Sequence, residues 1–217
     1  SQLPAPGANY APNGLTVSEI AVYGTEENLP VEPSNNLALG KEVTANPEII
    51  SNNPNEDGST GVARLNLVTD GEITNGWEKG CWYNPSIDVE NTDFKPWIQI
   101  DLGQSYEIGN IKYFGLMPPD YPGYTNTSYN MVFQVSNDPT FQDDTTVTVF
   151  NSDKNKFFGF GEGTDTDEPN TMNGRFIEFE AVNARYIRYY QHGSKMSDHN
   201  PPGWRNSLSA VEIEVYA

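Results

Sequence analysis

The stretch Trp97-Ile98-Gln99-Ile100-Asp101-Leu102-Gly103 carries the clearest structural signal in this chain. Aromatic or aliphatic residues alternate with polar ones through most of it. Successive side chains of a β-strand point to opposite faces, so a period of two predicts a strand over residues 97–102 with one buried face. The same reasoning predicts further strands at 131–136, 145–150, 176–179, 186–190 and 210–216.

These strands follow one another without helices between them. No stretch longer than about ten residues keeps a helical period of 3.6 free of breakers, and Gly, Pro, Asn and Asp cluster between the strands. The chain is therefore expected to be all-β, a sandwich or jelly-roll barrel. Long polar loops, which in compact domains are often functional, are expected at 47–63, 84–95, 118–130, 153–173 and 192–206. Within them, residues 159–163 are expected to form a mobile acidic loop.

One internal repeat bears on domain organisation. Residues 15–24 closely match residues 208–217, which end the chain. The segment 25–34, with two prolines and three glutamates, has the composition of a linker. Residues 1–34 are thus expected to be an N-terminal extension, whose strand either closes a preceding module or is recruited to this sandwich. Residues 35–217 are expected to be the main module.

Composition limits the possible partners. The net charge is -18, from 30 acidic and 12 basic residues. So acidic a chain repels phosphate backbones and anionic lipid headgroups, which argues against nucleic acid and plain membrane surfaces as partners. No apolar run approaches the ~20 residues of a membrane span, so no membrane insertion is expected. Cys81 is the only cysteine, so an internal disulfide is impossible.

Four other segments join the opening stretch to form an ordered set: Asn36-Leu37-Ala38-Leu39-Gly40-Lys41, Phe133-Gln134-Val135-Ser136-Asn137-Asp138, Ala184-Arg185-Tyr186-Ile187-Arg188 and Ala210-Val211-Glu212-Ile213-Glu214-Val215-Tyr216. In this order the set resembles the discoidin domain, also called the factor V/VIII type C domain, over residues 36–217. Bacterial members of that family are largely family 32 carbohydrate-binding modules. The resemblance implies a discoidin-like β-sandwich and a lectin-like binding module. Animal members usually carry a disulfide that ties their two ends together. This chain cannot form one, and the difference favours a bacterial origin.

The resemblance also implies a structural calcium ion. Residues 67–77, Leu-Val-Thr-Asp-Gly-Glu-Ile-Thr-Asn-Gly-Trp, match the family's calcium loop, where a tight Asp-Gly turn lets oxygens converge on one ion. Carried over by position, the carboxylate ligands are Asp70 and Glu212. The backbone carbonyl ligands are those of Leu67, Glu72 and Val211, and Asn75 stands where the family often has a threonine. From the residues alone, Asp70-Gly71 could equally indicate an ordinary turn without a metal ion.

A sugar site is expected in the loops. Carbohydrate modules stack aromatic rings on the apolar face of a pyranose and bind its hydroxyls with nearby polar groups. Suitable residues are Trp82, Tyr83, Tyr121, Tyr124, His192, Trp204 and Arg205. Trp204 is the first choice, with packing over the end of the sandwich as its alternative, whereas Trp77 and Trp97 are assigned to the core. Glu78 and Pro119 stand where galactose-binding members have His and Arg, which argues against galactose specificity.

No enzyme signature is recognisable. The two histidines, His192 and His199, fit neither a zinc motif nor a triad, and the glycines at 159–163 lack the Lys-Ser/Thr of a phosphate loop. The sequence is therefore interpreted as a non-catalytic, calcium-stabilised carbohydrate-binding module of a larger secreted or cell-surface bacterial protein. The resemblance implies that this larger protein is a glycoside hydrolase. The partners of the module would be a glycan and the neighbouring domains. The alternative is an adhesion or spacer domain without a sugar site, in which Trp204, Tyr121 and Tyr124 would be buried.

Overall fold

The computed structural model describes residues 35–46, 62–74, 81–83, 95–117, 126–196 and 208–217. The chain divides into two units, Ser1–Glu32 and Pro33–Ala217, and every described residue belongs to the second. The predicted N-terminal extension lies outside the described residues, so the division at residue 34 stays a prediction.

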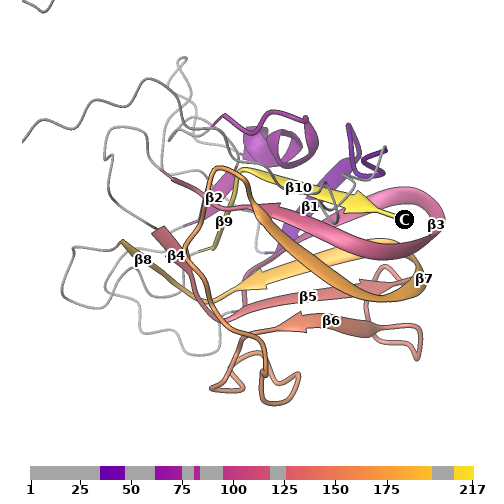
Figure 1. Ribbon diagram of the computed structural model, residues 1–217. Coiled ribbons are helices and arrows are strands. Elements are labelled where there is room, and N and C mark those ends of the chain that lie inside the picture. The colour runs from indigo at the N-terminus through magenta and orange to yellow at the C-terminus, as the bar shows by residue number, and fades with distance from the viewer. Residues whose placement is uncertain (1–34, 47–61, 75–80, 84–94, 118–125, 197–207) are drawn as a thin grey trace, which may run out of the picture. The chain divides into compact units, whose positions relative to one another are not determined.

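Strands make up nearly all the regular structure of the described part (Figure 1). The exception is one short 3₁₀ helix, η1, at Val62–Thr69. No helix in these ranges is long and apolar enough to cross a membrane. The strands are β1 (Glu42–Asn46), β2 (Cys81–Tyr83), β3 (Trp97–Phe114), β4 (Asn126–Ser128), β5 (Met131–Ser136), β6 (Val147–Asn151), β7 (Arg175–Gln191), β8 (Ser194–Met196), β9 (Leu208–Ala210) and β10 (Glu212–Tyr216).

Two long strands, β3 and β7, organise the fold. They pair antiparallel along their length, with register shifts between Asp101 and Tyr106 and between Ile108 and Asn110. Gly103 lies in the first shift with a φ of 86°, a left-handed conformation that favours glycine. Irregularities of this kind bend a strand and increase its twist. Both strands accordingly curve back on themselves at the same end of the molecule (Figure 1).

This curvature turns one continuous ladder into two layers. The first half of β3 pairs with β1 and with the second half of β7, and the order continues through β5 to the edge strand β6. The second half of β3 pairs with β10 and with the first half of β7. Two short ribbons, β2 with β9 and β4 with β8, complete the pairing of the described strands. The result is a discoidin-like β-sandwich, as the sequence predicts.

The predicted strands are confirmed, but their extents differ. β5 has the predicted bounds, whereas the predicted strands at 176–179 and 186–190 are parts of the single strand β7. Half of the residues between them, at 180–185, are exposed, and the segment shows no regular apolar alternation. The predicted strand 210–216 is interrupted at Val211, which separates β9 from β10.

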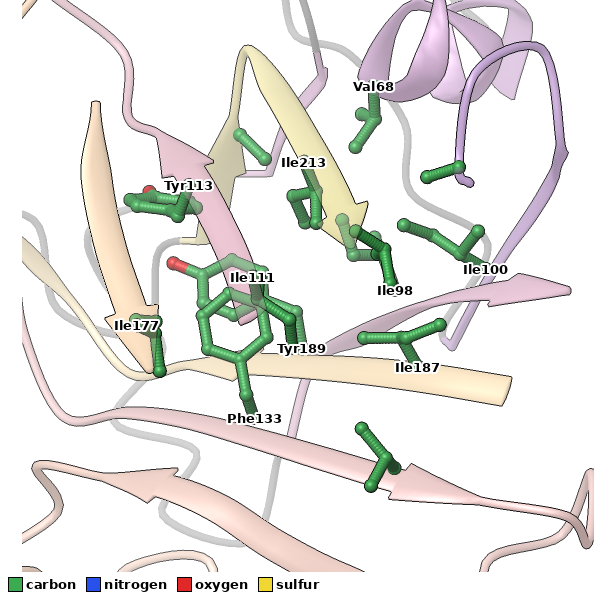
Figure 2. Packing of buried hydrophobic residues seen from close by; sticks show 14 of the residues in the cluster. Val68, Ile98, Ile100, Ile111, Tyr113, Phe133, Ile177, Ile187, Tyr189 and Ile213 are labelled. Atoms are coloured by element: carbon green, nitrogen blue, oxygen red, sulfur yellow. The ribbon is translucent and has the colours of Figure 1, made fainter. Parts of the chain in front are cut away.

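The main core lies between the two layers. Figure 2 shows Ile111 and Ile213 from one layer packed with Tyr189 of the other. Tyr113 contacts Phe133 edge-on at 6.1 Å, and Phe133 stacks on Tyr189 at 4.6 Å. Burying each such side chain stabilises the fold by about 1.5–3 kcal/mol relative to leaving it exposed.

A second, smaller cluster covers the outer face of the first layer. Val132, Tyr190 and Phe158 form it, and Trp97 and Phe157 pack against it. Val132 and Tyr190 point outward because the neighbours of each in its strand point into the core. Phe158 comes from the loop that follows β6 and lies over them. Trp97, which the sequence assigns to the core, is half-buried at this outer cluster.

The two ends of the module are joined by the side chain of Asn36. Its Oδ1 accepts hydrogen bonds from the N–H of Ala38 at 3.0 Å and from the N–H of Val215 at 3.1 Å. The N–H of Leu37 also donates to the carbonyl of Val215 at 2.8 Å. Backbone hydrogen bonds therefore hold the first described residues against β10, in a chain that has no disulfide.

Candidate functional site

The predicted metal loop and the last strand meet at the carboxylate of Glu212. This side chain is completely buried, and its Oε1 accepts a hydrogen bond from the N–H of Gly71 at 3.1 Å. The second oxygen, Oε2, is also buried, and no donor among the described residues reaches it. A buried polar atom without a partner costs free energy, so this oxygen has the property expected of an unused ligand.

The electrostatics around Glu212 disfavour a free carboxylate. Burial raises the pKa of Glu212 to about 9, and the nearby charges of Asp70 and Glu214 act in the same direction. The N–H of Gly71 opposes this rise without cancelling it. A cation beside Oε2 would remove the penalty, because it stabilises the charged form.

The other predicted metal ligands are placed as follows. Asp70 is exposed, and its Oδ1 accepts the N–H of Glu72 at 2.8 Å in a tight turn, while Gly71 has a φ of 83°. Leu67 is a half-buried residue within η1, which ends at Thr69, and Val211 is fully buried beside Glu212. Asn75 lies outside the described residues. In the ranges that the structure covers, no group of three or more His, Cys, Asp or Glu side chains converges.

This donor set fits a hard cation that takes backbone oxygens. The predicted ligands are the carboxylates of Asp70 and Glu212 together with backbone carbonyls of the loop, so every predicted ligand atom is an oxygen. The unpartnered Oε2 of Glu212 is the structural feature that agrees with such an ion. The metal ligands themselves stay a prediction.

Four of the predicted sugar residues belong to segments that are next to the paired strands β4 and β8 in the sequence. β4, which follows the segment 118–125 with Tyr121 and Tyr124, pairs with β8, which precedes the segment 197–207 with Trp204 and Arg205. Those four residues are outside the described residues. Trp82 and Tyr83 belong to β2, which pairs with Ser209 and Leu208 of β9, but their side chains are not described either.

His192 is the predicted sugar residue whose side chain the structure describes. It follows β7, is half-buried, and its N–H donates to the carbonyl of Tyr129 at 3.2 Å. Its carbonyl accepts from Nδ2 of Asn130 at 3.2 Å. The imidazole lies flat against the ring of Phe157, with 3.5 Å between ring centroids and 11° between planes.

Phe157 belongs to a loop held by one buried carboxylate. Asp153 is 1% exposed, and its Oδ2 accepts the N–H of Phe158 at 2.9 Å. The carbonyl of Asp153 accepts the N–H groups of Lys156 and Gly163 at 3.3 and 3.0 Å. The expected mobile acidic loop at 159–163 is thus part of an aromatic turn fixed by these hydrogen bonds.

Sequence reasoning missed the aromatic residues of this turn, Phe157, Phe158 and Phe160. Their signal is the run Phe157-Phe158-Gly159-Phe160-Gly161, in which three rings stand in a segment that is otherwise polar. In the structure, Phe158 is 3% exposed while Phe160 is 37% exposed. Which of these rings covers the sheet and which faces solvent depends on tertiary contacts.

Comparison with known proteins identifies the fold. No protein-family model matches the sequence, and no curated protein matches it significantly. Among solved structures, the fucolectin from striped bass (Morone saxatilis) serum is similar, with a TM-score of 0.50 and 16% identity over 85% of this chain and 47% of that chain. Chitosan-binding module 1 of a Paenibacillus sp. IK-5 chitosanase/glucanase gives 0.47 and 23% identity over 84% of this chain and 99% of that chain.

A third similar structure is the CBM32 of AlyQ in complex with 4,5-unsaturated mannuronic acid. Its TM-score is 0.45, with 18% identity over 81% of this chain and 93% of that chain. Such identities are too low to carry residue roles from one protein to another. The likeness to the fucolectin shows the shared discoidin-like fold, and a fold alone does not decide function.

Proposed function

We propose that this chain is a non-catalytic, calcium-stabilised carbohydrate-binding module of a larger secreted or cell-surface bacterial protein. The observation that carries the proposal is the stacked aromatic pair of Phe157 and His192, of which His192 lies just before β8, the strand that pairs with β4. Aromatic faces held beside polar loops are what a pyranose needs. The similar fish protein is named as a lectin.

Calcium has a structural role in this proposal. The ion would be held by the carboxylates of Asp70 and Glu212 and by carbonyls of the loop 67–72 and of Val211. It would neutralise the buried carboxylate and tie the 3₁₀ helix region to β10. A calcium ion in such a site supplies no open position for chemistry.

The module would act by proximity. In a larger protein, which the family resemblance suggests is a glycoside hydrolase, a bound glycan keeps the neighbouring catalytic domain near its substrate and raises the effective substrate concentration. The acidic surface, with its net charge of -18, disfavours nucleic acid and anionic lipid as competing partners.

A glycan array tests the sugar-binding function. The chain, with calcium present, should bind a restricted set of printed glycans, and Trp204→Ala should abolish that binding with little change in melting temperature. No binding to any printed glycan would favour the adhesion or spacer function instead. If Trp204→Ala unfolds the protein, Trp204 is a core residue and the sugar site lies elsewhere.

Catalysis is tested separately by product release. Incubation of complex glycans with the chain at high concentration should yield no new reducing ends and no unsaturated products. Turnover that a single carboxylate substitution abolishes would show that the chain is an enzyme.

A further inference from the structure

We propose that Phe157, backed by His192, forms a sugar subsite that takes one pyranose ring of the glycan. The inference rests on the proposed carbohydrate-binding function and goes beyond it, because it assigns binding to the turn that follows β6. The turn begins where Asn151 ends β6 beside Val132 of β5, at the same end of the sheet as His192.

The geometry of three rings shows which face of Phe157 is open. Phe157 and His192 are 3.5 Å apart and nearly parallel, so His192 covers one face. Phe158 lies 5.1 Å from Phe157 and 6.4 Å from His192, and is nearly perpendicular to both. These three centroid distances make an angle close to 90° at Phe157. Phe158 therefore contacts the edge of Phe157, and no ring contact among the described residues lies on the face opposite His192.

The conformation of the turn that carries Phe157 is fixed before any ligand binds. Lys156, the residue before Phe157, has a φ of 58°, a left-handed conformation that is uncommon outside glycine. Such a conformation has a free-energy cost and persists when the surroundings impose it. Here the hydrogen bonds to Asp153 and the buried Phe158 impose it. A preorganised ring loses little conformational entropy when a ligand stacks on it.

The different exposure of Phe157 and Phe158 indicates that the two rings have different roles, one in binding and the other in packing. Phe158 is 3% exposed and fills the outer cluster, so the packing role in this turn is already occupied. Phe157 packs against this cluster but is only half-buried, and its ring also stacks on the imidazole of His192. A ring that served only the cluster would gain by being buried as Phe158 is.

A hydrogen-bond donor stands beside the turn. The ammonium of Lys95 donates a hydrogen bond to the carbonyl of Phe158 at 3.0 Å, and Lys95 is exposed to solvent. In the part of the chain that the structure describes, no carboxylate forms an ion pair with it. An ammonium has three donors, so Lys95 keeps donors for an oxygen of the ligand. That oxygen is either a hydroxyl or a carboxylate of the pyranose.

Substitution of Phe157 tests the subsite. A wild-type array with neutral, N-acetylated, amino and uronic oligosaccharides identifies the tightest glycan, which calorimetry then measures against the variants. Phe157→Leu keeps apolar volume without a flat face and should weaken binding about fivefold or more, while Phe157→Trp should retain it. Phe176→Ala is the control, because Phe176 is 36% exposed but lies on β7 opposite Lys112 and should leave affinity unchanged.

The outcomes separate this inference from the proposed function. If the wild type binds glycan and Phe157→Leu, folded by its melting curve, binds equally well, the subsite is wrong and the function stands. If the wild type binds none of the array, both fail. Where the wild type does bind, Lys95→Gln identifies the ligand oxygen that Lys95 contacts. A more than tenfold loss of affinity that becomes smaller with added salt indicates a carboxylate, and a less than threefold loss of affinity indicates a hydroxyl.

Discussion

The N–H of Gly71 donates a 3.1 Å hydrogen bond to the carboxylate of Glu212, a residue 141 positions further along the chain. The bond joins the turn after the 3₁₀ helix to the first residue of β10. It uses one oxygen of a fully buried carboxylate and leaves the other without a donor among the described residues. This pair is where the metal hypothesis can be tested most directly.

Glu212→Gln should have opposite effects with and without calcium. In chelator at pH 7 the variant should melt at or above the wild-type temperature, because an amide avoids the cost of a buried carboxylate whose pKa burial raises to about 9. With millimolar calcium the wild type should gain melting temperature and the variant should not. Scanning fluorimetry measures both, with Glu214→Gln as the control for a nearby, half-buried glutamate.

An equal calcium response in Glu212→Gln and wild type would contradict the assignment. So would a wild type whose melting temperature calcium leaves unchanged. Asp70→Ala should remove most of the calcium effect, since it supplies the second carboxylate.

The ion pair of Asp101 and Arg185 should make stability depend on acid pH. Nε and Nη2 of Arg185 contact the two carboxylate oxygens at 2.7 and 2.8 Å. The hydrogen bond from Arg185 lowers the pKa of Asp101 below 3.8. A lowered pKa means stability that is present above pH 3.8 and lost as the pH falls through the folded-state value.

Arg185→Gln should therefore destabilise the protein near pH 7 and converge with the wild type at lower pH. Both side chains are about a third exposed, so screening by solvent keeps the effect on the free energy of unfolding small. Urea unfolding at several pH values measures it. A difference that does not shrink below pH 3.8 would show that the arginine acts by packing on Tyr186.

Gln191→Leu should destabilise the fold and weaken glycan binding together. The buried amide of Gln191 donates to the carbonyl of Gly193 at 2.7 Å and accepts from the N–H of Ser209 at 2.9 Å. Gln191 thus links Gly193 and Ser209, which lie on either side of the segment 197–207 that contains Trp204. Leaving these groups unpaired should cost about 2 kcal/mol or more. Gln134→Leu, which loses a single hydrogen bond to Thr148, should cost less and leave binding intact.

Gly163→Ala should disturb the Phe157 turn. A Cβ at Gly163 would lie 2.5 Å from the N of Asp153 and 2.6 Å from the O of Asn151, both backbone atoms that cannot move independently. The expected cost is about 1–3 kcal/mol, with weaker binding if Phe157 shifts. At Gly109 the nearest atom would be 3.8 Å away, so Gly109→Ala is the matched control. Equal melting temperatures for the two variants would show that the turn is not packed as described.

Alternation along the chain was sufficient to predict the strand content and the sandwich class. Strand β5 shows why: its inward residues Met131, Phe133 and Val135 alternate with outward ones, and this period depends only on local backbone geometry. The lengths of β3 and β7 could not be predicted in this way. Their bends leave residues such as Gln104 and Ser105 exposed within a strand, and in sequence these look like a turn.

The sequence by itself determined the all-β class and the lack of a disulfide, because these follow from local pattern and from composition. The candidate metal loop follows from the resemblance of residues 67–77 to a family's calcium loop. Tertiary structure alone decided that Glu212 is buried with one oxygen that no donor among the described residues reaches, and that Phe157 stacks on His192. These properties arise from contacts between segments far apart in the chain. Burial and ring geometry are set by what the other segment covers, and no local pattern records that.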